Sequence, residues 1–171
     1  YNKASIFFNF GTTGAQAGEQ TYFWDDMEFV GDPVIPLVLP VTFDDPQVNY
    51  DLVDFGGNLS EIIVDPLDPE NNIVQTIKTE TAELWAGTTV GGTDGFAEPI
   101  PFAAGSTLMS VAIWSPTAGT PIRLKVEDST NPTISVETET LTTVASEWEI
   151  LVFDFTNEAP GTAPLNLDNT Y

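Results

Sequence analysis

The side chains that could do chemistry in this 171-residue chain are mainly oxygen donors. The chain has 26 Asp and Glu against 4 Lys and Arg, which gives a formal charge of −22, and it contains no His and no Cys. Nucleophiles that depend on His or Cys, thiolate metal sites and disulfides are therefore excluded. Carboxylates, hydroxyls and amides remain, and these are the ligands that hard cations such as Ca²⁺ prefer.

Two pairs of aspartates give the clearest prediction of a cation site. In Thr21–Phe29, alternation places Asp25 on an otherwise apolar face and Asp26 on the opposite face, and Asp44 and Asp45 follow the same pattern in the VTFDD segment. A bare carboxylate is costly to bury unless it is paired or bound to a metal. We therefore predict a Ca²⁺ site built from Asp25, Asp26, Asp44 and Asp45, with the ligand of each pair left open. The alternative is that these are solvated carboxylates of turns and edges.

A second acidic stretch, DPLDPENN at residues 65–72, is better explained as a turn. Asp-Pro and Asn-Asn are ordinary turn sequences, and the stretch lacks the glycine and the alternating acids of an EF-hand.

The tryptophans are candidates for sugar binding, because pyranose rings stack on exposed aromatic planes. We select Trp85, which precedes a Gly-rich loop, and Trp114, which ends a strand before a Ser-Pro pair. Trp148 lies inside an apolar strand and is expected in the core, whereas Trp24 shares a face with Tyr22.

The few basic residues allow two interpretations. Arg123 and Lys125 share a strand face with Glu127, and Glu137 and Glu139 form a similar row on the next strand. This pattern is typical of a cross-strand ladder of ion pairs on a solvated face. Under the alternative, Arg123, Lys125 and Glu137 belong to a polar sugar-binding face.

Enzymatic activity is not expected. Two carboxylates can hydrolyse a glycoside, and Glu137 and Glu139 match part of the catalytic strand of jelly-roll glucanases. The third acid and the aromatic surroundings of that strand are missing, and the neighbours of both glutamates are threonines.

The elements that must position these residues are short strands. Thirteen prolines and thirteen glycines leave no window for a long helix. Period-two segments rich in Val, Ile, Thr and aromatics favour an all-β fold, an antiparallel β-sandwich of jelly-roll type. The clearest segments are Lys3–Phe10, Thr21–Val30, Leu108–Trp114, Ile122–Glu127, Thr133–Glu139 and Trp148–Phe155.

The segment Gly31–Pro40 has three prolines in ten residues and no alternation, which is typical of a semi-rigid linker. An edge strand or an ordered loop is the alternative. The linker interpretation divides the chain into residues 1–30, which end one repeat, residues 31–40, and residues 41–171, which form the main part of a second repeat.

Several stretches together resemble the jelly-roll modules appended to secreted laminarinases and other polysaccharidases of marine Bacteroidetes. The resemblance implies a galactose-binding-like sandwich with a structural calcium near the Asp pairs. It also implies an extracellular or cell-surface location. The stretches are VTFDD (41–45), ELWAGTT (83–89), SVAIWSPTAGTPIRLKVED (110–128), EWEILVFDF (147–155), NKASIFFNFG (2–11) and TYFWDDMEFVG (21–31).

The order of these stretches departs from the family pattern, because the final hairpin stands first. Joining Tyr171 to Asn2 restores the family order, which indicates one period cut from a tandem array or, alternatively, a circular permutant. The hydrophobic strands in 1–30 are expected to complete a sandwich, either in their own copy or in a neighbouring one.

The sequence thus predicts a non-catalytic, secreted, Ca²⁺-binding β-sandwich repeat that acts as a carbohydrate-binding or adhesive module. The expected partners are a polysaccharide, with a neutral β-glucan favoured, and neighbouring copies of the repeat. Nucleic acid is not expected, because the surface is acidic. Membrane insertion is not expected either, because no apolar run reaches the length of a membrane helix. The alternative function is a structural subunit of a filament or matrix fibre, assembled by strand exchange and without glycan specificity.

Overall fold

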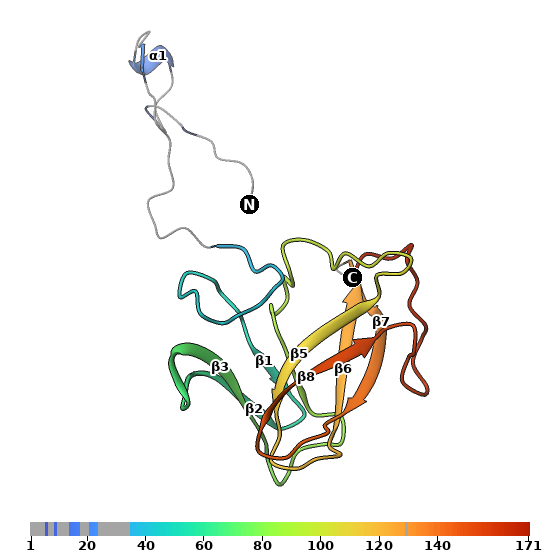
Figure 1. The fold of residues 1–171 in the computed structure, drawn as a ribbon. Helices are drawn as coiled ribbons and strands as arrows, with labels where there is room; N and C mark the ends of the chain where they lie inside the picture. Colours follow the sequence, from blue (N-terminus) through green and yellow to red (C-terminus); the bar gives the residue numbers. More distant parts are fainter. Residues whose placement is uncertain (1–5, 7–8, 10–13, 18–20, 24–34, 129) are drawn as a thin grey trace. The chain divides into compact units, whose positions relative to one another are not determined.

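The chain forms two units, Tyr1–Asp32 and Pro33–Tyr171, in a computed structural model that describes Ile6, Asn9, 14–17, 21–23, 35–128 and 130–171 (Figure 1). In the first unit the described residues include the one-turn helix α1 (Gly14–Ala17), and Thr21–Phe23 has no regular secondary structure. The remainder of the strands predicted over Lys3–Phe10 and Thr21–Val30 lies outside the described residues, apart from Ile6 and Asn9.

The second unit is built from strands alone in its described part, which confirms the all-β class. Its eight strands form four antiparallel pairs, β1–β4, β2–β3, β5–β8 and β6–β7. No helix in the described residues is long and apolar enough to cross a membrane. The strands are β1 (Val53–Phe55), β2 (Asn58–Asp65), β3 (Asp68–Lys78), β4 (Gly87–Thr89), β5 (Leu108–Trp114), β6 (Pro121–Asp128), β7 (Asn131–Leu141) and β8 (Trp148–Asp154).

Aspartates close the two hairpins of this unit. At the β2–β3 turn, Leu67 N donates to Asp65 Oδ1 at 2.8 Å and Glu70 N donates to Asp68 Oδ1 at 3.1 Å. At the β6–β7 turn, Asp128 Oδ1 accepts hydrogen bonds from both the backbone N and the hydroxyl of Thr130. A turn is therefore confirmed at Pro66 and Leu67, where Asp65 and Asp68 cap backbone N–H groups, whereas residues 68–72 belong to strand β3.

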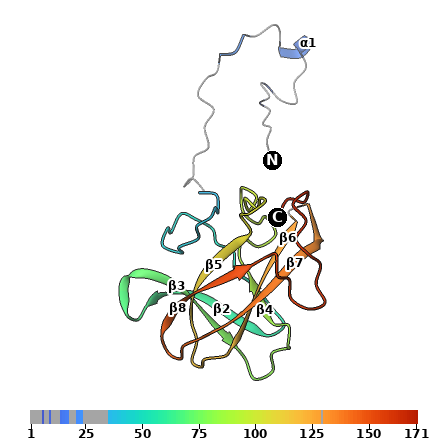
Figure 2. The same ribbon diagram turned by 45° about the vertical axis from the view of Figure 1, so that its right-hand side comes forward.

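The core lies between the β5–β8 pair and the β6–β7 hairpin (Figure 2). Alternate residues of each strand face inward, as the period of a strand requires. Phe153 of β8 is fully buried, and Val126 of β6 and Val136 of β7 are nearly so. Phe102 packs against Phe155, with ring centroids 5.1 Å apart, and against Tyr171 at 6.0 Å. The last residue of the chain is therefore part of the core.

The outer face of β5–β8 is apolar and exposed. Trp148, Ile150 and Val152 alternate with the buried Leu151 and Phe153, and they are 42%, 73% and 51% exposed. The prediction that Trp148 is a core residue is therefore wrong. Both sets of alternating residues on β8 are apolar, so alternation alone did not show which set faces the core.

Carboxylates on the strands and turns hold neighbouring segments by hydrogen bonds. Glu149 accepts bonds from the hydroxyl and backbone N of Thr143, and these bonds lower the pKa of Glu149. The pKa of Asp154 is lowered mainly by the hydrogen bond from the backbone N–H of Thr156, and the hydroxyl of Thr156 makes a smaller contribution in the same direction. The main cause that lowers the pKa of Asp128 is the hydrogen bond from the Thr130 hydroxyl, and backbone N–H donors lower it further. Part of the negative charge therefore stabilises loops.

The Pro-rich segment is described from Ile35 onward, and this part is attached to the second unit. Ile35 N donates to Gln47 O at 3.3 Å, Leu37 is buried, and Ala97 N donates to Leu37 O at 2.8 Å. Ile35–Leu37 therefore forms an ordered loop of the second unit, which was the alternative to the linker interpretation of Gly31–Pro40. Residues 31–34 lie outside the described part.

Candidate functional site

The loop 79–86, between β3 and β4, carries Trp85 and is fixed at several points. Glu83 N donates to Gly56 O at 2.8 Å, and Thr79 Oγ1 donates to Gly57 O at 2.9 Å. Within the loop, Ala82 N donates to Thr79 O and Ala86 N donates to Glu83 O. Trp85 is 65% exposed. A ring held by an anchored loop loses little conformational freedom when it binds a ligand.

Phe55, the last residue of β1, gives Trp85 an aromatic partner. The two rings are parallel to within 9°, with their centroids 6.2 Å apart. Phe55 is 41% exposed, so neither ring is covered by protein on all sides. We call Phe55 and Trp85 the aromatic platform. Parallel exposed rings are suited to stacking against the apolar C–H face of a sugar ring.

Two glycines allow the platform to lie close to the backbone. A Cβ at Gly56 would lie 2.9 Å from Trp85 Cζ3, and one at Gly87 would lie 2.6 Å from Phe55 Cζ. Gly87 is also the direct cross-strand partner of Phe55. Because real Cβ atoms do not approach other atoms this closely, the positions of both rings depend on these glycines.

A polar network on the opposite face of β1–β4 fixes the platform to the β2–β3 hairpin. Asp54 accepts a hydrogen bond from Thr88 Oγ1 at 2.7 Å and another from Ser60 N at 2.7 Å. The Ser60 hydroxyl lies 2.7 Å from Thr88 Oγ1 and 2.9 Å from Thr76 Oγ1. The bond from the Thr88 hydroxyl is the main cause that lowers the pKa of Asp54.

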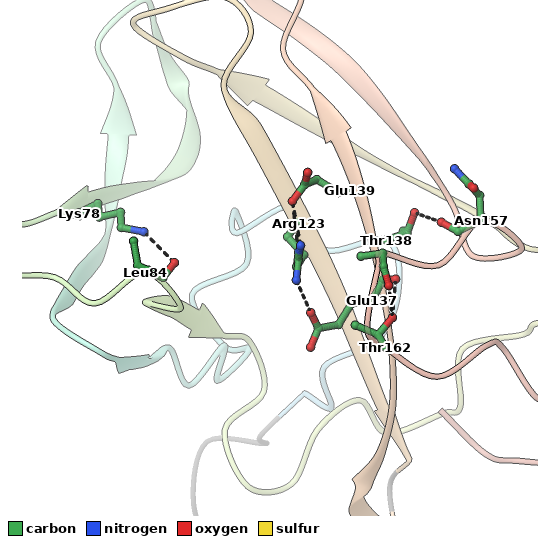
Figure 3. A network of polar contacts seen from close by, with 9 residues as sticks. Lys78, Leu84, Arg123, Glu137, Thr138, Glu139, Asn157 and Thr162 are labelled. Atoms are coloured by element: carbon green, nitrogen blue, oxygen red, sulfur yellow. Dashed lines mark hydrogen bonds and ion pairs between the residues drawn. The ribbon is translucent and has the colours of Figure 1, made fainter.

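Two polar side chains lie near the platform in the chain, Lys78 at the end of β3 and Glu83 on the loop. Lys78 Nζ donates to Leu84 O at 3.2 Å and forms no ion pair with any carboxylate of the described residues (Figure 3). Glu83 is exposed two residues before Trp85. An ammonium has three donors. Lys78 therefore retains donors for ligand hydroxyls, and Glu83 supplies acceptors.

The other selected tryptophan, Trp114, also has an aromatic partner. It is the cross-strand partner of Trp148, and the two side chains are 46% and 42% exposed. Their neighbours on this outer face of β5–β8 are Leu108, Ala112, Ile150 and Val152, and the face also carries Ser110 and Asp154, whose carboxylate accepts hydrogen bonds from Thr156. A surface with so few hydrogen-bonding groups fits a sugar less well than the aromatic platform does.

The charged residues of β6 and β7 form the predicted cross-strand ion pairs at Arg123 (Figure 3), whereas Lys125 pairs within its own strand. Arg123 donates to Glu137 at 3.0 Å and to Glu139 at 3.1 Å, and Lys125 pairs with Glu127. The hydrogen bonds to Glu137 and then Glu139 raise the pKa of Arg123. Arg123 and Glu137, two of the three residues that the sugar-face alternative assigned to a ligand, are therefore paired with each other.

The described residues alone do not fit a calcium site. Asp44 Oδ1 accepts a hydrogen bond from Asn72 N at 2.8 Å, and Asp45 Oδ1 accepts one from Gln47 N at 2.9 Å. The described part of the chain contains no group of three or more acidic side chains placed to hold a metal. Asp25 and Asp26 lie outside the described residues, so the Ca²⁺ site stays a prediction.

Sequence reasoning found two of the aromatic positions and missed their partners. Phe55 was missed because its partnership with Trp85 depends on the register of β1 with β4. The sequence signals are Gly87, two residues after Trp85, which leaves room for the Phe55 ring, and Gly56, directly after Phe55, which leaves room for the Trp85 ring. Lys78 was missed because nothing in its sequence neighbourhood shows that it reaches Leu84.

The chain matches no protein-family model, and neither the curated proteins nor the solved structures give a match. The functional argument therefore depends on the geometry described above.

Proposed function

We propose that this protein is a non-catalytic carbohydrate-binding module that acts outside the cell and binds a polysaccharide at the aromatic platform. One observation carries the proposal. Phe55 and Trp85 are parallel, exposed and held by anchored backbone, and within the described residues the Lys78 ammonium donates only to Leu84 O while Glu83 is exposed on the same loop as Trp85. This combination of a stacking surface with a few polar groups is the usual composition of a sugar site.

The charge of the chain favours a neutral glycan such as a β-glucan. A formal charge of −22 repels uronates and sulfated sugars over the range of the Debye length. Stacking and hydrogen bonding to hydroxyls need no charge on the ligand. Binding of a neutral glycan is therefore expected to depend only weakly on salt.

The fold proposed with this function is a β-sandwich of jelly-roll type. The packing of β5–β8 against β6–β7 across the core supports two layers. Ca²⁺ is proposed as a structural ligand that would use Asp44 or Asp45 together with Asp25 or Asp26.

The test is affinity electrophoresis or calorimetry with soluble β-glucans such as laminarin. A sugar that covers one face of the 65%-exposed Trp85 would bury about 50–80 Å², worth about 1–2 kcal/mol. We therefore expect Trp85→Ala to weaken binding about tenfold or more.

Phe55→Ala is expected to act in the same direction as Trp85→Ala. Leu84→Ala is the matched control, because Leu84 is 97% exposed on the same loop and lies outside the platform. Absence of binding to every neutral glucan would contradict the proposal.

The second candidate is a structural subunit of a filament or matrix fibre, assembled by strand exchange without glycan specificity. The β2–β3 hairpin favours it, because the cross-strand partners Leu59 and Ile77 are 59% and 52% exposed and Val64 is 55% exposed. Fibres seen by electron microscopy, from a protein that binds no glycan, would support this candidate over the first.

A further inference from the structure

Four side chains on four strands form one chain of hydrogen bonds on the face of β1–β4 opposite the aromatic platform. Thr76 Oγ1 of β3 lies 2.9 Å from Ser60 Oγ of β2. Ser60 Oγ lies 2.7 Å from Thr88 Oγ1 of β4, and Thr88 Oγ1 donates to Asp54 Oδ1 of β1 at 2.7 Å. Asp54 directly precedes Phe55 of the platform. The carboxylate that ends this chain of bonds is therefore the sequence neighbour of one of the two rings.

The carboxylate of Asp54 fixes the direction of every bond in the chain. A carboxylate only accepts hydrogen bonds, so the single hydroxyl hydrogen of Thr88 is used toward Asp54. Ser60 must then donate to Thr88, and Thr76 must donate to Ser60. Bonds aligned in one direction strengthen one another, and bonds to a charged acceptor are the strongest. Strands β1, β2, β3 and β4 are therefore linked through the negative charge of Asp54.

Protonation of Asp54 would weaken this network. Asp54 Oδ2 accepts from Ser60 N at 2.7 Å, so both of its oxygens face donors. Thr88 Oγ1 accepts from Ser60 Oγ and from Asn58 Nδ2 at 3.3 Å, which occupies both of its lone pairs. A proton on Asp54 therefore meets no acceptor in the network, and the remaining bonds lose the contribution of the charge.

The charged residues near Asp54 come from β2, β3 and the loop 79–86, because β4 has none. Glu61 of β2 lies on the opposite strand face from Ser60, and the Lys78 ammonium of β3 donates to Leu84 O. Within the described residues, the hydrogen bonds of Asp54 come from uncharged donors alone. The other charged residues of these elements are Asp65, Asp68, Glu70, Glu80 and Glu83.

We propose that Asp54 is a positioning residue of the aromatic platform, and that its carboxylate must be charged for the two rings to keep their places. Strands β1 and β4 have only three residues each, so their backbone ladder contributes few bonds. The Thr88 hydroxyl is the main cause that holds the pKa of Asp54 below its ordinary value. The charged form is therefore complete at neutral pH and is lost as the pH falls below about 4. The effect on glycan affinity rests on the function proposed above, whereas the effect on the rings does not.

Fluorine NMR of the full chain labelled with fluorotryptophan tests the effect on the rings without any glycan. The Trp85 resonance is identified by its loss in Trp85→Ala. In the original chain this resonance is expected to shift as the pH is lowered from about 6 to about 3. In Asp54→Asn it is expected to be displaced already at about pH 6 and to change less with pH. Glu83 titrates in both chains, so the difference between them reports Asp54.

Calorimetry with laminarin tests the effect on affinity. Asp54→Asn keeps the shape of the side chain but places an amide donor against Thr88 or Ser60 N, and it is expected to weaken binding about threefold or more at neutral pH. Thr88→Val is a second variant, because it removes the hydroxyl with little change of shape, and it is expected to act in the same direction. Circular dichroism checks that both variants are folded.

Asp154→Asn is the matched control. Asp154 on β8 likewise accepts hydrogen bonds from a threonine hydroxyl and a backbone N–H, both of Thr156, and the substitution changes the net charge by the same amount. It is expected to leave the Trp85 resonance, its response to pH and the affinity for laminarin unchanged.

Two outcomes would overturn the proposal. One is a Trp85 resonance that responds to pH in Asp54→Asn as it does in the original chain, and the other is an affinity that Asp54→Asn weakens no more than Asp154→Asn does. A Trp85 resonance that depends on Asp54 in a chain that binds no glucan would support the positioning role and contradict the function proposed above.

Discussion

Truncation of Phe153 tests the assignment of the inner face of β8. Phe153 is 0% exposed and belongs to the core cluster with Val126, Val136 and Leu151. Removing such a ring loses its transfer free energy and leaves a cavity, which typically costs about 3–5 kcal/mol. At about 2–4 °C per kcal/mol for a chain of this size, Phe153→Ala is expected to lower Tm by about 6–20 °C.

The matched control for Phe153→Ala lies three residues earlier on the same strand. Ile150 is 73% exposed on the outer face, so Ile150→Ala is expected to change stability by about 0.5 kcal/mol or less in dilute protein. Urea unfolding of both variants, followed by tryptophan fluorescence, gives the comparison. Equal losses of stability, or a larger loss for Ile150→Ala, would refute the assignment of inner and outer faces.

Three further predictions concern pH, the platform glycines and metal. The lowered pKa values of Asp54, Asp128 and Asp154 mean that the folded state binds fewer protons than the unfolded state. The stability that these carboxylates contribute should therefore be complete above about pH 5 and fall as the pH drops through about 4 and below. Melting curves recorded between about pH 2 and about pH 7 would show this fall. A melting temperature that does not change with pH would contradict it. Gly87→Ala should displace the Phe55 ring and weaken glucan binding with both aromatics still present, and unchanged affinity would contradict the geometry. If Ca²⁺ is bound, EGTA should lower Tm and added Ca²⁺ should restore it, whereas an unchanged Tm would contradict the metal site.

The strands that sequence reasoning located best are those with the clearest alternation. The predicted segment Leu108–Trp114 coincides with β5, and Ile122–Glu127 lies within β6. Thr133–Glu139 lies within β7, and Trp148–Phe155 exceeds β8 by one residue. In these segments β-branched and aromatic residues recur at period two between turn residues, so local preference and packing agree.

The platform was only partly predictable, because it depends on contacts between distant parts of the chain. An exposed position for Trp85 followed from its Gly-rich surroundings. The pairing with Phe55 depends on the β1–β4 register and on the hydrogen bond from Glu83 to Gly56, which join segments about thirty residues apart. Single-strand patterns contain no information about such long-range pairing.

The misassignment of Trp148 has a different cause. The sequence places Trp148, Ile150 and Val152 on one face of β8 and Leu151 and Phe153 on the other, and both sets are hydrophobic enough to form a core. The larger context decides between them, because β6 and β7 lie on one side of β8.

A double-mutant cycle on the aromatic platform tests the central claim most directly. Calorimetry with a β-glucan oligosaccharide would compare the original chain with Phe55→Ala, Trp85→Ala and the double variant. Because the Phe55 and Trp85 rings stack on each other, loss of either one disturbs the other, so each single change should weaken binding, and the double variant should lose less than the sum of the two by about 0.5 kcal/mol or more. Binding that is unchanged in Trp85→Ala, or absent in the original chain, would contradict the claim that the platform is a sugar site.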